Sequence, residues 1–345
     1  MPALAVADAL RARGAQVEFI GGERAEVELV PAAGYPFHRL RVAGLDRSNP
    51  LRAARALLLS AHATGRARRL LKRIGADAVI GGGGYVAGPV GLAARTLRLP
   101  LVLTEADSHL GVSNRLLAPF AARVCLAFPI PGRTGAKWLV TGRPIPPGTE
   151  RGDGEAARAR LGVPADGRCL LVFGGSLGAR RLNEAAVEAF GAGAPCAVLH
   201  ASGRRDYDEL RARLAELGSP AHYRLLPYIE PFADALAAVD FAAARAGGSV
   251  FELAAAGLPS ILVPYPHATG NHQDANARFM EAAGAAVVIP DAELDGPRLA
   301  REVGGLLAGP QRMAEMAGAA RAVAKPDAAE VVASELLRLV ANDAH

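Results

Sequence analysis

The sequence predicts an α/β protein with two doubly wound domains, each built on a Rossmann-like parallel sheet. Short runs of β-branched residues and leucine recur roughly every 20–30 residues, with helical Ala/Leu/Arg/Glu stretches between them. The 345 residues, 51% hydrophobic, suffice for two such domains. Between the two series of strands lies Gly142–Gly148, whose three prolines suit neither a helix nor a central strand. We therefore expect two domains that face each other across a ligand cleft.

The first half begins with an expected helix over residues 1–10 and continues with six strands. These strands are expected at Val17–Ile20, Phe37–Val42, Ala78–Gly81, Leu101–Thr104, Val124–Phe128 and Trp138–Thr141. The main helices between them are expected at Pro50–Ile74 and Gly88–Leu97.

The second half repeats the pattern, and a helix is expected after every strand. Its strands are expected at Cys169–Phe173, Ala197–Ala201, Tyr223–Leu226, Phe241–Ala243, Ser260–Pro264 and Ala286–Ile289. The expected division is a first domain over 1–142, a linker over 143–153, a second domain over 154–326, and a final helical segment, 327–345, long enough to pack back on the first domain.

Charge is divided unevenly between the halves. Residues 1–150 carry 20 basic and 10 acidic side chains, whereas residues 151–345 carry 19 and 24. A basic half indicates a polyanionic partner, either nucleic acid or anionic lipid headgroups. Aromatic residues make up only 5% and are not interleaved with the basic ones, so we expect no nucleic-acid partner. Arg66, Arg69 and Arg73 share one helical face near several leucines, which fits an anionic membrane surface or an ordinary solvated face.

Three features exclude other classes of protein. No apolar run approaches the roughly 20 residues that span a bilayer, and no secretion signal is present. The three cysteines are widely spaced among apolar residues, which favours buried, reduced thiols over disulfides or a metal site.

A glycine-rich turn follows the expected strand Cys169–Phe173. In Val172–Arg180, Gly174, Gly175 and Ser176 come where a helix begins, and free N–H groups there favour a phosphate. The spacing matches neither a Walker loop nor a dinucleotide-binding fingerprint. Ser176 as a plain N-cap is the alternative.

The segment Arg245–Glu252 repeats this arrangement later in the same half. Ser249 and Glu252 have the spacing of a capping box, in which both side chains only satisfy backbone N–H groups. The other interpretation is that the helix start receives a pyrophosphate and the Glu252 carboxylate binds both hydroxyls of a ribose. The sequence leaves both open.

Four segments, in order and correctly spaced, resemble the MurG family of UDP-N-acetylglucosamine transferases, which have the GT-B fold and act in peptidoglycan synthesis. They are Gly82–Pro89, Gly174–Ala179, Arg245–His267 and His272–Ala277. The resemblance covers nearly the whole chain. It implies an inverting transfer of N-acetylglucosamine from its UDP donor to the 4-hydroxyl of a muramic acid carried on undecaprenyl pyrophosphate. It also implies a peripheral enzyme on the cytoplasmic face of the cell membrane, bound to the anionic inner leaflet.

The resemblance assigns roles to individual residues. On the donor side it implies that Ser176, Arg245, Gly248 and Ser249 surround the pyrophosphate, that the Ile229 backbone reads uracil, that Glu252 binds the ribose, and that His272, Gln273 and Asp107 contact the donor. The resemblance also implies residues that serve the acceptor and the membrane, namely Gly83, Gly84, Tyr85, Arg66, Arg69 and Arg73. Neither a metal nor another cofactor is implied.

This chain departs from the family at three places. Thr104–Asp107 stands where His-Glu-Gln-Asn is usual, which leaves Glu105 as first and Asp107 as second candidate for the general base. Gly142–Pro146 replaces Gly-Asn-Pro-Val-Arg, and Arg245–Glu252 is one residue short. The family also begins with a strand and a Gly-Gly-Thr-x-Gly-His turn, so we expect a first strand and turn to be missing before residue 1, through a late start codon or a true truncation.

Two other functions remain open from the sequence. A related GT-B transferase with another lipid or small-molecule acceptor has the same donor motifs, because a fold does not fix its substrate. A non-catalytic UDP-sugar-binding protein of the cell wall would keep the donor motifs and lose the base. Turnover with a lipid acceptor separates the enzymes from the binding protein.

Overall fold

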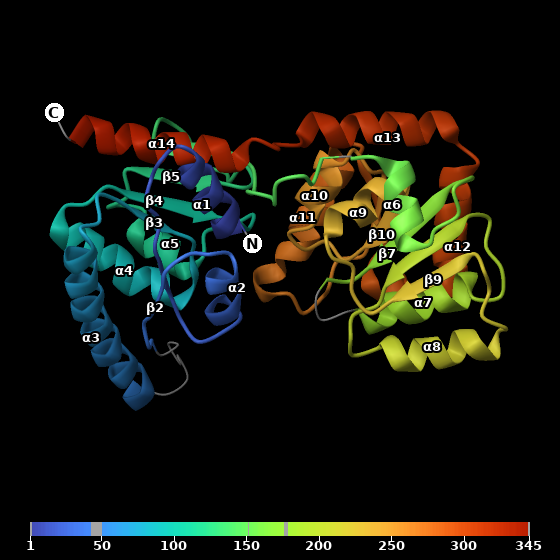
Figure 1. Ribbon diagram of the computed structural model, residues 1–345, viewed down its shortest axis with the longest axis horizontal. Coiled ribbons are helices and arrows are strands. Elements are labelled where there is room, and N and C mark those ends of the chain that lie inside the picture. Colours follow the sequence, from blue (N-terminus) through green and yellow to red (C-terminus); the bar gives the residue numbers. More distant parts are fainter. Residues whose placement is uncertain (1, 43–49, 151, 176–178, 344–345) are drawn as a thin grey trace. The chain divides into compact units, whose positions relative to one another are not determined.

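The computed structural model describes residues 2–42, 50–150, 152–175 and 179–343. The chain divides into two compact units (Figure 1). Unit 1 comprises residues 1–146 and 326–345, and unit 2 comprises residues 147–325.

Unit 2 is a doubly wound α/β unit with a six-stranded parallel sheet. Its strands are β7 (Cys169–Phe173), β8 (Ala197–Ala201), β9 (Tyr223–Leu226), β10 (Phe241–Ala244), β11 (Ser260–Leu262) and β12 (Ala286–Val288). The order in the sheet is β12-β11-β10-β7-β8-β9, so the winding direction reverses between β7 and β10. Such a reversal is where α/β proteins bind ligands, beyond the carboxyl ends of the strands.

Eight helices surround this sheet in the described part of unit 2. They are α6 (Gly154–Leu161), α7 (Arg180–Phe190), α8 (Tyr207–Glu216), α9 (Phe232–Ala238), α10 (Val250–Ala255), α11 (His272–Ala282), α12 (Gly296–Leu307) and α13 (Pro310–Val323). Because helices cover both faces, the central strands are apolar throughout, and every residue of β7 and β10 is buried.

A buried polar network on β8 includes His200, which is fully enclosed. Asn183 donates its Nδ2 hydrogens to Ser202 O and Asp206 Oδ2, so its Oδ1 atom accepts from His200 Nε2 at 3.0 Å. His200 Nδ1 then accepts from the Tyr223 hydroxyl at 2.8 Å. The histidine is thus a neutral Nε2–H tautomer, and burial lowers its pKa to about 3.

We expect His200 to make unit 2 sensitive to acid. The folded pKa lies below the ordinary value of 6.5, so the unfolded chain binds more protons between these values and stability falls as pH falls through this window. His200→Leu should cost about 1–3 kcal/mol at pH 7, because two buried polar groups lose their partner. The cost should shrink at pH 5, where only the wild type carries the protonation penalty.

Urea unfolding followed by circular dichroism at both pH values measures this cost. Fluorescence of the single tryptophan, Trp138 in unit 1, is the internal control and should be unaffected by the substitution. An equal cost at pH 7 and pH 5 would contradict a buried neutral histidine.

In the described residues of unit 1, six parallel strands form two separate sheets. Strands β1 (Phe19–Gly21) and β2 (Phe37–Arg39) pair with each other, whereas β3 (Val79–Gly81), β4 (Leu101–Glu105), β5 (Arg123–Leu126) and β6 (Trp138–Val140) form a sheet in that order. The helices of unit 1 are α1 (Pro2–Ala12), α2 (Glu26–Ala32), α3 (Pro50–Ile74), α4 (Gly84–Leu97), α5 (Val112–Leu117) and α14 (Ala328–Asp343).

The last helix, α14, packs on unit 1. Val332, Ala333 and Leu336 share a buried cluster with Val6 and Leu10 of α1. Arg123 Nε donates to Glu335 Oε2 at 3.0 Å, which adds a polar contact between β5 and this helix. The chain therefore returns to its first unit after completing the second.

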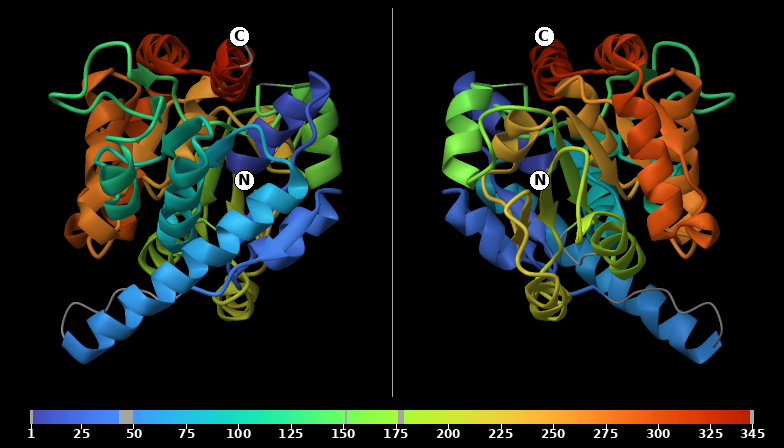
Figure 2. Two further views of the ribbon diagram at one scale, coloured as in Figure 1. Left: turned by 90° about the vertical axis from the view of Figure 1, so that its left-hand side faces the viewer. Right: turned by 90° about the vertical axis from the view of Figure 1, so that its right-hand side faces the viewer.

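The long helix α3 runs diagonally across unit 1, and its amino-terminal half extends beyond the neighbouring elements (Figure 2). Ala63, Ala67 and Leu71 repeat every four residues and are buried, so they mark the face that packs on the unit. The neighbouring helix α4 begins at Gly84, four residues before the predicted start at Gly88. Its N-cap residue Gly83 has φ of 80°, a conformation that favours glycine.

The three cysteines are free and buried. Burial raises the pKa of the Cys125 and Cys169 thiols to about 12 and that of Cys196 to about 11. All three thiols therefore stay protonated at neutral pH and belong to the core.

Candidate functional site

The glycine-rich turn and the Arg245 segment of unit 2 lie side by side at the reversal of the sheet. Strands β7 and β10 pair so that Phe173 is opposite Ala244, and Arg245 N donates to Phe173 O at 3.3 Å. Gly174 and Gly175 leave β7 at this point, and Gly175 has φ of 88°. Ser176 lies outside the described residues. The two predicted phosphate-binding segments thus meet at one edge of the sheet.

Arg245 is buried at this edge of the sheet, with 7% of its surface exposed. Its Nη1 atom donates to Val263 O at 3.2 Å and to Asp291 Oδ1 at 2.5 Å, and its guanidinium lies 5.6 Å from the centre of the Tyr265 ring. These partners follow β11 and β12, so Arg245 ties together the loops after three neighbouring strands. The resemblance assigns Arg245 to the donor; in the structure its Nη1 atom is bonded to protein atoms, and the donor role stays a prediction.

The start of α10 does not have the geometry of a capping box. Ser249 has helical φ and ψ of −64° and −12°, and its side chain makes no capping hydrogen bond. Glu252 is half-buried in the first turn of α10, and it follows the buried Arg245 in the sequence. The Ser249 side chain therefore does not cap this helix, and the ligand-binding interpretation of the segment stays a prediction.

Helix α11 holds the same loop from the other side. Asn276 Nδ2 donates to Ala246 O at 3.0 Å, while its buried Oδ1 atom has no hydrogen-bond partner. Gln273 Oε1 accepts from Tyr265 N at 2.9 Å. Its Nε2 atom lies 4.0 Å from the position that a Cβ atom at Gly247 would take. His272, half-buried, begins the helix. The Gln273 side chain therefore lies beside the Gly247–Gly248 segment.

Ile229 lies in the loop between β9 and α9 and is buried, with 4% of its surface exposed. The ring of Phe232, at the start of α9, meets the Phe173 ring edge-on with centres 5.0 Å apart. This contact holds the start of α9 against the carboxyl end of β7. Ile229 therefore lies in a loop that is anchored at the same edge of the sheet.

No cluster of three or more metal-binding side chains occurs in the part of the chain that the structure describes. One Asp-x-Asp spacing, Asp206 and Asp208, does occur. Asp206 accepts from Arg205 Nε and Asn183 Nδ2, both at 2.9 Å, and Asp208 is largely exposed on α8. Asp206 therefore anchors the loop after β8, whereas Asp208 faces solvent beside Arg211 of the same helix.

In unit 1, glycines follow β3 where its carboxyl end meets α5. Gly83 and Gly84 have φ of 80° and 76°, and the exposed Tyr85 comes next. Ser113 Oγ donates to Gly84 O at 2.6 Å, and Asn114 Nδ2 lies about 3.7 Å from where a Gly83 side chain would begin. Ser113 of α5 therefore holds the glycine turn, a contact that the sequence does not indicate.

Glu105, at the end of β4, is buried and fully engaged. Its Oε2 atom accepts from Gly111 N at 2.8 Å and from Asn114 Nδ2 at 2.9 Å, and its Oε1 atom accepts from Asp107 N at 3.3 Å. The carboxylate thus holds the loop 106–111 in place. Asp107, carried by this loop, is half-exposed, and its backbone N–H is held by Glu105.

Arg66, Arg69 and Arg73 are all exposed on α3, together with Arg68 and Lys72. Five basic side chains thus fall within eight residues, opposite the buried face of the helix. Leu71 belongs to that buried face and Leu59 is exposed, while the side chains of Leu57 and Leu58 lie outside the described residues.

Comparison with known proteins covers almost the whole chain. Residues 1–126 match the glycosyltransferase family 28 N-terminal domain, and residues 169–332 match the glycosyltransferase family 28 C-terminal domain. Proteins from Methylococcus capsulatus and Halothermothrix orenii are 42% and 37% identical over 340 and 339 residues, which is 97% and 94% of this chain and 94% and 91% of theirs. Both are named UDP-N-acetylglucosamine–N-acetylmuramyl-(pentapeptide) pyrophosphoryl-undecaprenol N-acetylglucosamine transferase.

Solved structures show the same fold. MurG from Acinetobacter baumannii has a TM-score of 0.79 at 32% identity, over 98% of this chain and 95% of that one. A UDP-GlcNAc 2-epimerase from Neisseria meningitidis has a TM-score of 0.64 at 12% identity, over 97% and 95%, and is similar in fold alone.

Two parallel-sheet units, with glycine turns at the reversal point of the second sheet, have the architecture of the GT-B fold, and the matches to both family 28 domains identify a glycosyltransferase of this class. Within this class, the chain belongs to glycosyltransferase family 28 and to its MurG members.

Proposed function

We propose that this chain is the N-acetylglucosamine transferase that converts the undecaprenyl-pyrophosphate-linked muramyl peptide into its disaccharide form, with UDP-N-acetylglucosamine as donor. The main support is that the donor segments Gly174–Gly175, Arg245–Glu252 and His272–Gln273 gather at one edge of the unit 2 sheet in a chain about 40% identical to such transferases. In this reaction the acceptor oxygen bonds to the anomeric carbon of the sugar, the bond to the phosphate breaks, and UDP leaves.

We assign donor binding to unit 2. The Gly247–Gly248 backbone and Ser249 serve the pyrophosphate, Glu252 the ribose hydroxyls, the Ile229 backbone the uracil, and His272 and Gln273 the sugar. Arg245 supports these residues through Asp291 and Val263. In this assignment, side chains and backbone N–H groups contact the ligand, and the buried Arg245 holds the loops that carry them.

We assign the acceptor to unit 1, at the turn Gly83–Gly84 and Tyr85. The attacking hydroxyl needs an acceptor for its proton, and Asp107 is the better placed of the two carboxylates. Glu105 already accepts three hydrogen bonds from its own loop and from Asn114, so we assign it the role of holding Asp107 in position.

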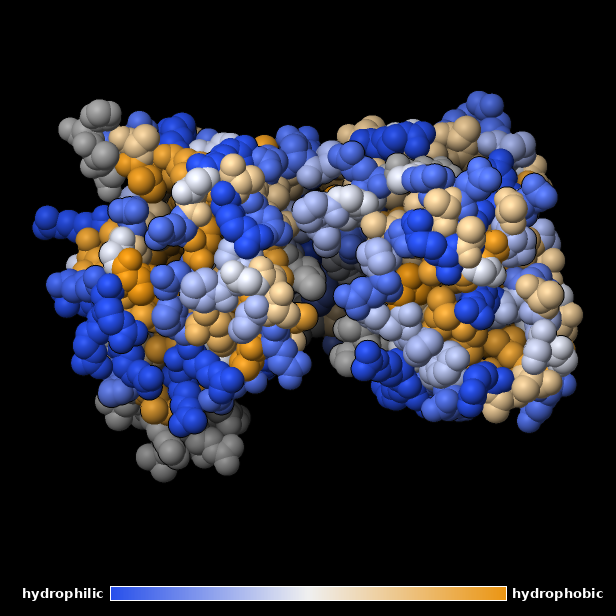
Figure 3. Space-filling model, in the orientation of Figure 1, coloured by the Kyte–Doolittle hydropathy of each residue, from blue (hydrophilic) through white to orange (hydrophobic). Residues whose placement is uncertain are grey.

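We also propose that unit 1 binds the cytoplasmic face of an anionic membrane. No helix among the described residues is long and apolar enough to span a bilayer. Hydrophilic side chains cover the region of α3 in unit 1 (Figure 3), and the exposed cations of residues 66–73 lie there. The same unit exposes Leu92, Leu116 and Phe120, and Arg95 stacks over the Phe120 ring. Cations next to exposed apolar side chains fit a headgroup surface.

The donor assignment is tested by Glu252→Ala. A carboxylate that binds two hydroxyls makes charge-assisted bonds worth about 1.5–3 kcal/mol, so UDP affinity should fall by tens of fold in titration calorimetry. Glu252→Gln keeps the shape of the side chain and removes its charge. Its UDP affinity should lie between those of the wild type and Glu252→Ala. Unchanged UDP affinity with a lowered unfolding temperature would show that Glu252 serves only the helix.

The transfer itself is tested by UDP release with the lipid-linked acceptor. Release that depends on this acceptor is expected. Donor binding without release with any lipid acceptor would instead identify a non-catalytic UDP-sugar-binding protein. Release with a different lipid or a small-molecule acceptor alone would identify a related transferase.

A further inference from the structure

The loop after β8, at the carboxyl edge of the unit 2 sheet, carries an exposed arginine, Arg205. The base of this loop is fixed, because Ser202 N donates to Leu226 O at 3.0 Å and Asn183 Nδ2 donates to Ser202 O at 2.9 Å. Gly203, with φ of 79°, then turns the chain. Arg205 follows with 62% of its side-chain surface exposed. A long cationic side chain is thus mounted on a rigid loop beside the donor segments.

Asp206 sets the direction of this side chain. Its carboxylate is buried, and its Oδ1 atom accepts from Arg205 Nε at 2.9 Å. Its Oδ2 atom accepts from Asn183 Nδ2, also at 2.9 Å, so the carboxylate itself is held by a buried amide. An arginine bonded through Nε to a fixed carboxylate has less freedom to turn than an ordinary surface arginine.

The Arg205 side chain reaches across the edge of the sheet. In the order β11-β10-β7-β8, two strands separate β8 from β11. The hydrogen bond with Asp206 and its charge raise the pKa of Arg205 most, and the Tyr265 hydroxyl, on the loop after β11, raises it further. The segments that follow the two strands in between are Gly174–Gly175 and Gly247–Gly248. Arg205 is therefore directed across the carboxyl ends of β7 and β10, where both glycine segments lie.

Arg205 is also the least neutralised of three arginines around these segments. Arg245 Nη1 donates to Asp291 and Val263 O. Arg180 lies within 4.0 Å of three carboxylates, those of Glu209, Asp206 and Glu184. Among the described residues, Asp206 is the one hydrogen-bond partner of Arg205, bound through Nε and Nη2. The Nη1 group of Arg205 is therefore available to an anion.

The neighbours of Arg205 indicate which part of the donor it meets. Strand β9, whose following loop contains Ile229, lies on one side of β8, and Tyr265 lies on the other side. Tyr265 N donates to Gln273 Oε1 at 2.9 Å. We assign Ile229 to the uracil and Gln273 to the sugar, so the Arg205 guanidinium points from the uracil end of the donor toward its sugar end. The group on that path is the pyrophosphate, and the phosphate nearer the sugar is the β-phosphate.

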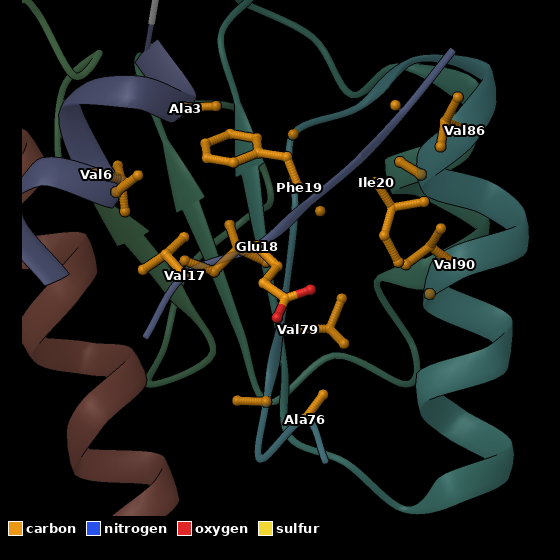
Figure 4. Close-up of a pocket in the computed structure, with 18 of the residues that line it drawn as sticks. Ala3, Val6, Val17, Glu18, Phe19, Ile20, Ala76, Val79, Val86 and Val90 are labelled. Atoms are coloured by element: carbon orange, nitrogen blue, oxygen red, sulfur yellow. The ribbon is translucent and has the colours of Figure 1, made fainter. Parts of the chain in front are cut away.

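The large cavity of unit 1 has a different chemistry. It is lined by residues of β1 and β3, and Figure 4 shows apolar side chains such as Val6, Val17, Ile20 and Val90, together with the Glu18 carboxylate. A multiply charged phosphate among such groups loses its hydration without gaining a cation in return. The rigid, exposed arginine of unit 2 suits a phosphate better.

We propose that Arg205 donates from its guanidinium to the β-phosphate of the UDP donor, with Asp206 as the residue that orients it. This inference rests on the proposed function and extends its donor assignment. In the transfer, the acceptor oxygen bonds to the anomeric carbon, and the electron pair of the broken bond passes to the β-phosphate oxygen. The proton of the acceptor hydroxyl goes to Asp107. Arg205 stabilises the negative charge that the departing UDP gains.

Titration calorimetry with UDP and with UMP tests this contact. In Arg205→Gln, the affinity for UDP should fall by about 10–100-fold, the usual effect of losing a charge-assisted hydrogen bond. The affinity for UMP, which has no β-phosphate, should stay close to that of the wild type and shows that the variant is folded. Arg205→Lys keeps the charge beside Asp206 and loses the planar fork of donors, so its UDP affinity should lie between those of the wild type and Arg205→Gln.

Arg204→Gln is the matched control. Arg204 is exposed in the same loop, so its replacement removes the same charge one residue earlier. It should bind UDP as the wild type does. Equal losses in Arg204→Gln and Arg205→Gln would mean that the loop acts only through its overall charge, which would overturn the proposal. Equal losses for UDP and UMP in Arg205→Gln, with a lowered unfolding temperature, would show that Arg205 serves only to stabilise Asp206, and would overturn it too.

The rate of UDP release with the lipid-linked acceptor is the second readout. The kcat of Arg205→Gln should fall by about 10²–10³-fold, the usual effect of removing one donor to a charge that develops in the transition state. Failure of the proposed function has a different signature. A wild type that binds UDP and releases none with a lipid acceptor would contradict the transfer, while a selective loss of UDP affinity in Arg205→Gln would still support the contact. Unchanged UDP affinity and kcat in Arg205→Gln would overturn the contact and leave the transfer intact.

Discussion

Asp107→Asn is expected to lower kcat by about 10²–10⁴-fold, the usual contribution of a positioned general base. The substitution keeps the size of the side chain and removes its ability to take the proton of the attacking hydroxyl. Affinity for UDP should not change, because the residues assigned to the nucleotide belong to unit 2. Rates of UDP release with saturating lipid acceptor give kcat, and calorimetry with UDP gives the donor affinity.

Glu105→Gln is the matched comparison for this prediction. Glutamine has one acceptor oxygen where Glu105 uses two, so a buried donor in the loop loses its partner, at a cost of about 1–3 kcal/mol in unit 1. We expect a lower unfolding temperature and a smaller loss of kcat than in Asp107→Asn. The opposite pattern would return the role of base to Glu105.

The sequence predicts the strands well because parallel strands covered on both faces are continuous apolar runs. Cys169–Phe173 is such a run, and it is β7 with the predicted bounds. The start of α4 is harder to predict. Gly88 and Pro89 resemble a helix start, yet the left-handed Gly83 begins the helix earlier. The division of unit 1 into two sheets depends on which strands pair, and periodicity within a strand carries no information on pairing.

The candidate site shows a similar division between local and distant information. The donor segments are local in sequence, so their glycines, Ser249, Glu252 and Gln273 can be singled out from the sequence. The partner of Arg245 is Asp291, 46 residues later, and no local pattern connects the two. In the same way, Glu105 has the appearance of a free acid at a strand end until the fold brings Asn114 and Gly111 to it. The contacts that hold site residues in place are therefore what the sequence alone does not show.

Replacing Arg66, Arg69 and Arg73 together by Gln is expected to weaken binding to anionic vesicles by about 100-fold at low salt. Each cation near such a surface contributes about 1 kcal/mol, and all three are exposed on α3. The effect should fade as salt is raised, since screening shortens the reach of these charges. Co-sedimentation with vesicles of phosphatidylglycerol and phosphatidylcholine, at two salt concentrations, measures it.

The control for this prediction removes the same charge elsewhere. Arg213, Arg301 and Arg312 are exposed on three separate helices of unit 2, so their replacement by Gln changes the net charge equally without touching α3. If the membrane recognises a surface of unit 1, this second variant should keep most of its vesicle binding, and both variants should keep their affinity for UDP. Equal losses in the two variants would mean that net charge alone attracts the protein to the membrane. Wild-type binding by the α3 variant would mean that these cations form an ordinary solvated face, and the contact would then have to rest on the apolar side chains of Leu92, Leu116 and Phe120.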